Sequence, residues 1–168
     1  MTAKLTGTAA LVTGASSGIG AATARRLAEH GASVALVARR RDRLEALAAE
    51  IDKAGGTALA VEADITDRTQ AEAAVQQAVE RFGRLDTLVN NAGLMLLGPV
   101  VAADTEEWDR MIATNVQGLL YTTPAALPHL LQAAEEGPRR VADIVNISSI
   151  AGRVAWNGTA STTSPNSA

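Results

Sequence analysis

The sequence has no cysteine and only two histidines, His30 and His129. Without cysteine there is neither a disulfide framework nor a thiolate metal site, and two imidazoles argue against a multi-histidine metal site. Aromatic side chains are also scarce, with one Phe, two Trp and one Tyr. The core must therefore be built from Ala, Val, Leu and Ile.

Two further absences concern partners and location. The net charge of −3 gives no indication of the positively charged surface that binds nucleic acid. The first residues, "MTAKLTGTAALVTG", lack the apolar segment of a signal peptide, and no apolar run is long enough to span a bilayer. Hydrophobic residues make up 47% and charged residues 20%, which is typical of soluble globular proteins. The sequence predicts a cytoplasmic protein without a membrane or nucleic-acid partner.

Short apolar runs alternate with helical patterns along most of the chain. Strands are predicted at residues 8–14, 33–38, 57–64, 85–93 and 141–148, and helices at 18–31, 41–56, 71–83 and from 104 towards 134. Asp67 and Gln70 have the spacing of a helix N-cap and its N3 residue, and Asp104 and Glu107 repeat it. This order predicts an α/β fold, a Rossmann-type doubly wound parallel sheet with helices on both faces.

The predicted domain organisation is one dinucleotide-binding domain over residues 1–155. We expect its sheet to be truncated after the fifth strand. The last residues, 156–168, have low complexity and almost no apolar content, so we expect a disordered tail there.

A glycine-rich loop, "VTGASSGIG", joins the first predicted strand to the first predicted helix and contains Gly14, Gly18 and Gly20. Glycines there let the backbone approach a pyrophosphate, which then rests on the free N–H groups of the helix N-terminus. The alternative is a turn with no ligand, but the strand-to-helix context favours a cofactor. The predicted cofactor residues in this loop are Gly14, Ser16, Ser17, Gly18, Ile19 and Gly20.

Three motifs agree in order and separation: the Gly-x-x-x-Gly-x-Gly loop, "NNAG" at 90–93 and "NISSIAG" at 146–152. Together they resemble the short-chain dehydrogenase/reductase family over residues 5 to about 160. The stretches "MLLGPV", "MIATN", "ALPHLL" and "SSIAGRV" are similar to clavulanate-dehydrogenase-type bacterial reductases. The resemblance implies hydride transfer between a nicotinamide cofactor and a small-molecule carbonyl or secondary alcohol. It also implies a homo-oligomer for the complete family member.

The end of the second predicted strand indicates which dinucleotide is bound. An NAD enzyme usually places a carboxylate there, whereas this chain has Ala38 followed by Arg39. A guanidinium at this position can hold the 2′-phosphate of NADP, so we expect NADP(H) in preference to NAD(H). The alternative is that Arg39, Arg40, Arg41 and Arg43 form a solvated helix start.

The resemblance assigns further cofactor contacts at the ends of the third and fourth predicted strands. Asp64 would face the adenine, and Ile65 would line the ring. Asn91, Ala92 and Gly93 would pass beneath the cofactor ribose. The alternatives are a turn residue for Asp64 and a tight turn tying neighbouring strands for "NNAG", and for "NNAG" both interpretations can hold at once.

The family's catalytic group comprises a Tyr, a Lys, a Ser and an Asn, of which two can be placed here. Asn115 in "MIATNVQG" matches the Asn, and Ser149 in "NISSIAG" matches the Ser. Alternatively, Asn115 is a polar residue bending its helix, and the serines make hydrogen bonds at a strand end. The Tyr and Lys are expected at positions 162 and 166, where the chain has Thr162 and Asn166.

We therefore expect the chain as written not to turn over substrate. Loss of a single base after the Ser149 codon would explain the terminal sequence, because a shifted frame through "STTSPN" can encode Tyr-x-x-x-Lys. The alternative is a genuine truncation. Two rival hypotheses are a non-catalytic NADP(H)-binding module and an unstable remnant whose fifth strand is an unpaired apolar edge.

Overall fold

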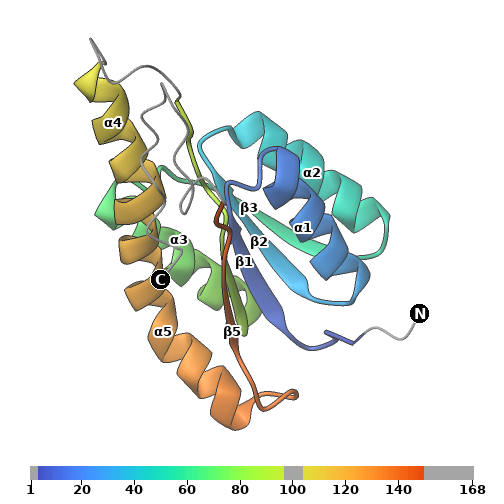
Figure 1. Ribbon diagram of the computed structural model, residues 1–168. Coiled ribbons are helices and arrows are strands. Elements are labelled where there is room, and N and C mark those ends of the chain that lie inside the picture. The colour runs from blue at the N-terminus through green and yellow to red at the C-terminus, as the bar shows by residue number, and fades with distance from the viewer. Residues whose placement is uncertain (1–3, 97–103, 150–168) are drawn as a thin grey trace.

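The computed structural model describes residues 4–96 and 104–149 as a parallel sheet between two layers of helices (Figure 1). The strands are β1 Ala9–Thr13, β2 Ser33–Ala38, β3 Thr57–Glu62, β4 Thr87–Asn90 and β5 Asp143–Asn146. The helices are α1 Gly18–Glu29, α2 Arg41–Lys53, α3 Arg68–Phe82, α4 Thr105–Ile112 and α5 Gly118–Glu136. A π-helical turn, η1 Ala113–Gln117, joins α4 to α5.

The strand order is β3-β2-β1-β4-β5, and each neighbouring pair is parallel. The chain builds outward from β1 to β3 and then returns to the other side of β1, so the order reverses between β1 and β4. Open α/β sheets bind ligands beyond the carboxyl ends of their strands at such a reversal. The predicted doubly wound fold is confirmed, and it brings the loops after β1 and β4 together.

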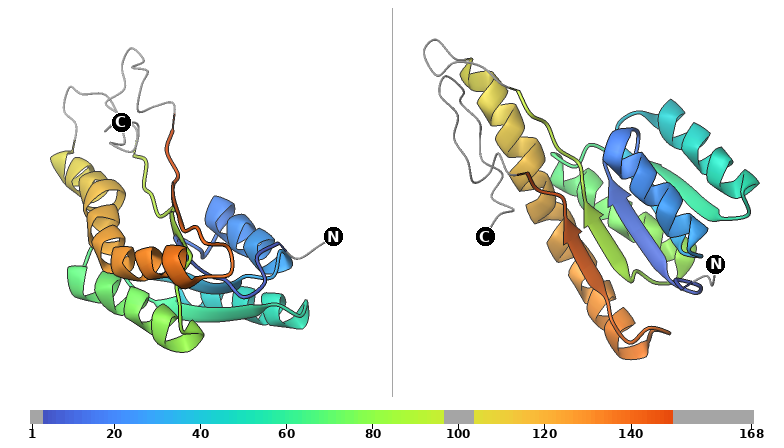
Figure 2. Two further views of the ribbon diagram at one scale, coloured as in Figure 1. Left: turned by 90° about the horizontal axis from the view of Figure 1, so that it is seen from below. Right: turned by 45° about the vertical axis from the view of Figure 1, so that its right-hand side comes forward.

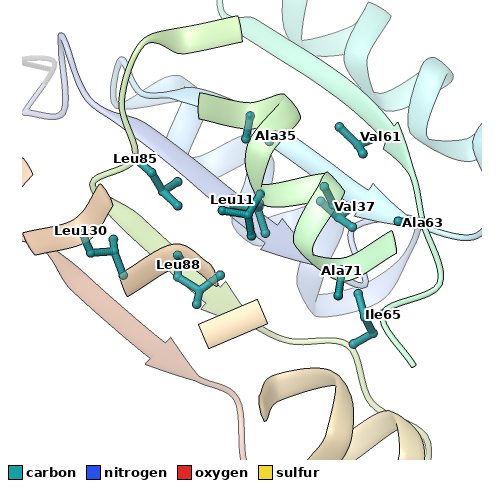
Figure 3. Close-up of a cluster of buried hydrophobic side chains, with 14 residues drawn as sticks. Leu11, Ala35, Val37, Val61, Ala63, Ile65, Ala71, Leu85, Leu88 and Leu130 are labelled. Carbon is teal, nitrogen blue, oxygen red and sulfur yellow. The ribbon is translucent and has the colours of Figure 1, made fainter. Parts of the chain in front are cut away.

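Aliphatic side chains fill both sides of the sheet. Leu11 and Leu88 face α3 and α5 (Figure 3), whereas Val12 and Val89 face α1 and α2. This alternation follows from the two-residue period of a strand, and the views in Figure 2 show the helices on both faces. Within the described ranges, no helix is long and apolar enough to cross a membrane.

The predicted N-caps are present, with two differences in detail. The Asp67 carboxylate accepts the backbone N–H of Gln70 at 2.9 Å, as the spacing predicts. The Gln70 side chain accepts the N–H of Asp64 at 3.0 Å, so it secures the end of β3 rather than closing a reciprocal box with Asp67. Asp104 caps the N–H of Glu106 at 2.9 Å, one residue before the expected position.

Strand β5 departs from the expectation that every strand is covered on both faces. Ile144 and Val145 point to opposite faces of the sheet, and each is more than 40% exposed. β5 lies at the edge of the sheet that the described residues form, with β4 as its partner there. Its apolar pattern therefore predicts the strand correctly but overestimates its burial.

Candidate functional site

The loop between β1 and α1 comes very close to the loop after β4. Gly14 has φ +66°, and a Cβ added to it would lie 2.8 Å from the Cα of Ala92. A Cβ on Gly20 would collide with the carbonyl oxygen of Gly14 and with the Asn91 amide. Side chains at either glycine would push the two loops apart, so packing alone requires glycine at both positions.

Hydrogen bonds hold this junction in place. The Thr13 hydroxyl accepts the backbone N–H groups of Asn91 and Ala92, each at 3.0 Å, and donates to the Val89 carbonyl at 3.3 Å. The Asn91 amide donates to the carbonyls of Thr13 and Gly14 at 2.9 and 3.3 Å. The "NNAG" turn therefore ties β4 to β1, as one of its two interpretations requires.

A cavity of about 330 Å³ opens beyond the carboxyl ends of β1, β2, β3 and β4. This volume falls in the range of small-molecule sites. Nine of the predicted cofactor residues line it: Gly14, Ser16, Ser17, Arg39, Asp64, Ile65, Asn91, Ala92 and Gly93. The other three predicted residues, Gly18, Ile19 and Gly20, form the first turn of α1 beside it. The sheet thus gathers predicted residues from four separate loops around one cavity.

The first turn of α1 starts next to this cavity. Ser17 is the N-cap residue, but its hydroxyl makes no capping bond to the helix, and the first turn contains no acidic side chain. The first N–H groups of a helix have no partner within the helix, and the helix dipole favours an anion there. Ile19 is 61% exposed on the same turn. This end of α1 has the chemistry of an anion site bordering the cavity.

Positive charge gathers on the wall formed by the end of β2. Arg39 is 76% exposed, and its Nη1 lies 3.7 Å from Asp64 Oδ2 in a long ion pair. Asp64 Oδ1 accepts the N–H and the hydroxyl of Thr66 at 3.0 and 2.8 Å, so the carboxylate also shapes the turn after β3. Arg40 instead donates to Ser16 and Ser17 across the cavity. The two arginines lie on the same wall but have different partners.

The two predicted catalytic residues lie farther along the same edge of the sheet. Asn115 sits in η1, where its Oδ1 accepts the N–H of Leu94 and its Nδ2 donates to the Leu94 carbonyl, both at 2.8 Å. A Cβ on Gly93 would lie 3.5 Å from Asn115 Oδ1. Asn115 therefore fixes the chain directly after "NNAG", and it does so from a π-helical turn.

Ser149 follows β5 and is exposed, as is Ser148. The strand therefore delivers both serines to the carboxyl edge of the sheet, where the cavity also opens. Thr162 and Asn166, which occupy the positions expected for Tyr and Lys, lie outside the described residues, and so does the predicted tail. Tyr121 lies in α5 and packs against the core cluster of α3, with the Arg68 guanidinium 5.0 Å from its ring.

Two residues of the site were missed by sequence reasoning. Thr13 supplies the hydroxyl that joins the two loops, and Arg40 reaches the glycine-rich loop. The basic run after β2 signalled that an arginine would face the cavity, but not which one would contact the serines. Nothing in the sequence distinguishes Thr13 from an ordinary strand residue.

A fully buried charged side chain, that of Asp86, lies away from this cavity, at the amino edge of the sheet. Asp86 is fully buried and accepts two bonds from Arg84, at 2.6 and 2.7 Å, and one from the N–H of Ala9 at 2.8 Å. The hydrogen bond to Asp86 raises the pKa of Arg84 above its ordinary value. This pair fixes the start of β4 against β1 and has a structural role.

Comparison with known proteins agrees with the sheet order, the glycine-rich loop and the cavity at the strand reversal. A family model described as short chain dehydrogenase matches residues 8–164. The chain belongs to the short-chain dehydrogenase family. This confirms the resemblance carried by the three motifs.

Curated relatives of this short-chain dehydrogenase include an uncharacterized oxidoreductase of Listeria innocua, 40% identical over 148 residues, 88% of this chain and 57% of that protein. A 2,5-dichloro-2,5-cyclohexadiene-1,4-diol dehydrogenase of Sphingobium indicum is 38% identical over 161 residues, 96% of this chain and 62% of that protein. The chain thus spans about three fifths of the length of these relatives.

Solved structures of the family agree with the fold. A mutant short-chain dehydrogenase/reductase of Serratia marcescens superposes with a TM-score of 0.83 at 39% identity, covering 92% of this chain and 60% of that one. A short-chain type dehydrogenase/reductase of Mycobacterium marinum gives 0.85 at 33% identity, covering 96% and 63%. The described part of this chain therefore has the Rossmann-type architecture of these enzymes.

Proposed function

We propose that this chain is the NADP(H)-binding part of a short-chain oxidoreductase whose complete form acts on a small-molecule carbonyl or secondary alcohol. The observation that carries the cofactor choice is the position of Arg39 on the cavity wall, with Ala38 where an NAD enzyme has a carboxylate. A guanidinium there suits a 2′-phosphate, because a charge-assisted fork of N–H donors matches phosphate geometry.

The residues around the cavity fit this cofactor. The N-terminus of α1 offers N–H groups for the pyrophosphate, and Gly14 and Gly20 keep the loop close enough to reach them. All five residues Asp64, Ile65, Asn91, Ala92 and Gly93 line the cavity, where by likeness to the family the first two would contact the adenine and the last three the ribose. When bound, the cofactor would donate a hydride to a carbonyl carbon in its reduced form, or accept one from an alcohol carbon in its oxidised form.

The chain's own polar groups would hold the reacting atoms. Asn115 keeps the loop after "NNAG" in place through Leu94. By likeness to the family, Ser149 would polarise the substrate oxygen. The family's proton donor is a Tyr whose phenol, titrating near 10 in its free form, becomes useful at neutral pH only beside a cation. With Thr162 and Asn166 at those positions, we propose that this chain binds cofactor without turnover.

A binding experiment tests the cofactor choice. We expect NADPH to bind about tenfold more tightly than NADH, the effect of one charge-assisted hydrogen bond, and Arg39→Asp to abolish or reverse that preference. Arg43→Asp makes the same charge change on an exposed α2 side chain and should leave the preference unaltered. Unchanged NADPH affinity in Arg39→Asp would overturn the assignment.

Both the proposal and its rival, a module that senses or sequesters NADP(H) in its own right, predict no turnover by this chain, so a chain with a restored continuation separates them. The 168-residue chain, saturated with NADPH, should consume none of it with a panel of ketones and aldehydes. Measurable turnover would overturn the inactivity that we propose. Turnover gained after restoring a Tyr-x-x-x-Lys continuation from the gene would favour the oxidoreductase over the binding module.

A further inference from the structure

Arg40 links the two helices whose amino ends border the cavity. Its Nη2 donates to the hydroxyls of Ser17 and Ser16 at 2.9 and 3.1 Å, and its Nε lies 3.3 Å from the Ser16 hydroxyl. Arg40 is the N-cap residue of α2, and Ser17 is the N-cap residue of α1. A single side chain thus connects the start of α2 to the glycine-rich loop.

The neighbouring Arg39 is held quite differently. Its one ion pair, to Asp64, is long at 3.7 Å, and three quarters of its side chain is exposed. Arg39 can therefore turn its N–H donors towards a ligand and would give up a long ion pair in doing so. Arg40 would have to give up two hydroxyl partners to do the same, although both residues line the cavity.

A brace is useful at this loop because glycine makes it flexible. Gly14 and Gly18 both have positive φ, and ordering the backbone of such a loop carries an entropic cost. If the loop is ordered before a ligand arrives, the ligand does not bear that cost, and affinity rises without any new contact to it. The bonds from Arg40 act on the two serines between these glycines.

We propose that Arg40 is a positioning residue that orders the glycine-rich loop through Ser16 and Ser17. It strengthens NADP and NAD binding by the same factor, whereas Arg39 alone discriminates between them. The proposal rests on the proposed function in two respects, that the cavity binds a dinucleotide and that Arg39 meets the 2′-phosphate of NADP. It concerns the part of the cofactor common to both dinucleotides.

The test measures the dissociation constants of NADP⁺ and NAD⁺ by calorimetry for the 168-residue chain and its variants. Arg40→Ala should weaken both about fivefold, the effect of losing one net hydrogen bond, and leave their ratio unchanged. Arg39→Ala should weaken NADP⁺ alone. Arg40→Lys keeps the charge but loses the two-serine fork, so both cofactors should again weaken together. Urea unfolding of each variant controls for loss of fold.

A double-mutant cycle separates bracing from simple charge. Ser16→Ala/Ser17→Ala should weaken both cofactors, and adding Arg40→Ala should cost less than it does in the wild type, because the brace is already gone. Additive losses would overturn the proposal. So would a selective loss of NADP⁺ in Arg40→Ala, which would make Arg40 a phosphate ligand, or no loss at all. If the wild type bound neither dinucleotide, the proposed function would fail and this inference with it.

Discussion

The centre of the sheet and its β5 edge differ sharply in burial. Every residue of β1 is buried, whereas β5 has no buried residue and three exposed ones. The difference appears directly in two cross-strand pairs, Leu88 with Ile144 and Asn90 with Asn146, in which the β4 member is buried and the β5 member is exposed. The glycine-rich loop and the arginines follow buried strands of what we call the inner region (β1, β2, β4, α1 and α2). Asn115 lies in the turn directly before α5, and Ser149 follows β5.

The edge of the sheet, the outer region (β5 and α5), also uses different chemistry, with a polar network that joins it to β4. The Asn90 amide donates to Asn146 Oδ1 at 2.9 Å and to Thr123 Oγ1 at 3.1 Å, and the buried Thr122 hydroxyl donates to Asn90 Oδ1 at 2.8 Å. The face of α5 away from the sheet carries exposed Leu120, Leu127 and Leu131. The proposed cofactor contacts thus lie on the packed inner region, whereas Asn115 and Ser149 lie beside the more exposed outer one.

The largest expected effect comes from the apolar pair. Leu88→Ala removes a side chain that packs in the core with Leu130 and should lower the free energy of unfolding by about 3 kcal/mol. Ile144→Ala removes a 43% exposed side chain on the same face and should cost about 1 kcal/mol. Urea unfolding of both variants measures the contrast. Equal losses would mean that β5 is covered in solution and that the two regions do not differ.

The fold was predictable because its signals are local. The apolar runs predict the strands, and the spacing of Asp67 and Gln70, three residues apart, predicts a helix start. The order of elements then limits the sheet topology. The exposure of β5 was not predictable in this way. Ile144 and Val145 have the composition of a central strand, and burial depends on what other segments pack there.

The candidate site likewise contains residues that the sequence predicts and one contact that it does not. Gly14, Arg39 and Asn91 could be assigned to one cavity because parallel strands end at one edge of the sheet. The bond from Arg40 to Ser17 depends on side-chain rotamers and on the spacing of two helices. A run of arginines does not encode which of them turns inward, so the positioning role emerges only from the structure.

A smaller effect is expected from the polar pair. Asn90→Ala removes three side-chain hydrogen bonds, to Thr122, Thr123 and Asn146, and should destabilise the protein by about 2 kcal/mol, although the Thr122 hydroxyl keeps the Gly118 carbonyl at 3.1 Å. Asn146→Ala removes one exposed partner of the same amide and should cost less than about 1 kcal/mol. Thermal unfolding distinguishes the two. If Asn146→Ala proved as costly as Asn90→Ala, the network would depend on β5 and the outer region would be more cohesive than its exposure implies.

The smallest effect probes the inner region through pH. Arg25 Nε and Nη2 contact Glu50 at 2.7 and 2.9 Å, joining α1 to α2, and this hydrogen bonding lowers the pKa of Glu50 below its ordinary value of 4.5. A lowered pKa in the folded state means that the contribution to stability is present above 4.5 and is lost as pH falls through the folded-state pKa. Glu50→Gln should therefore shift the urea midpoint slightly downward at about pH 7, and the difference from wild type should shrink as the pH falls below 4.5 and through the folded-state pKa. Glu72→Gln, on an exposed position of α3, controls for the loss of one negative charge. A difference between Glu50→Gln and wild type that persisted undiminished in acid would show that the carboxylate charge is not what joins the two helices.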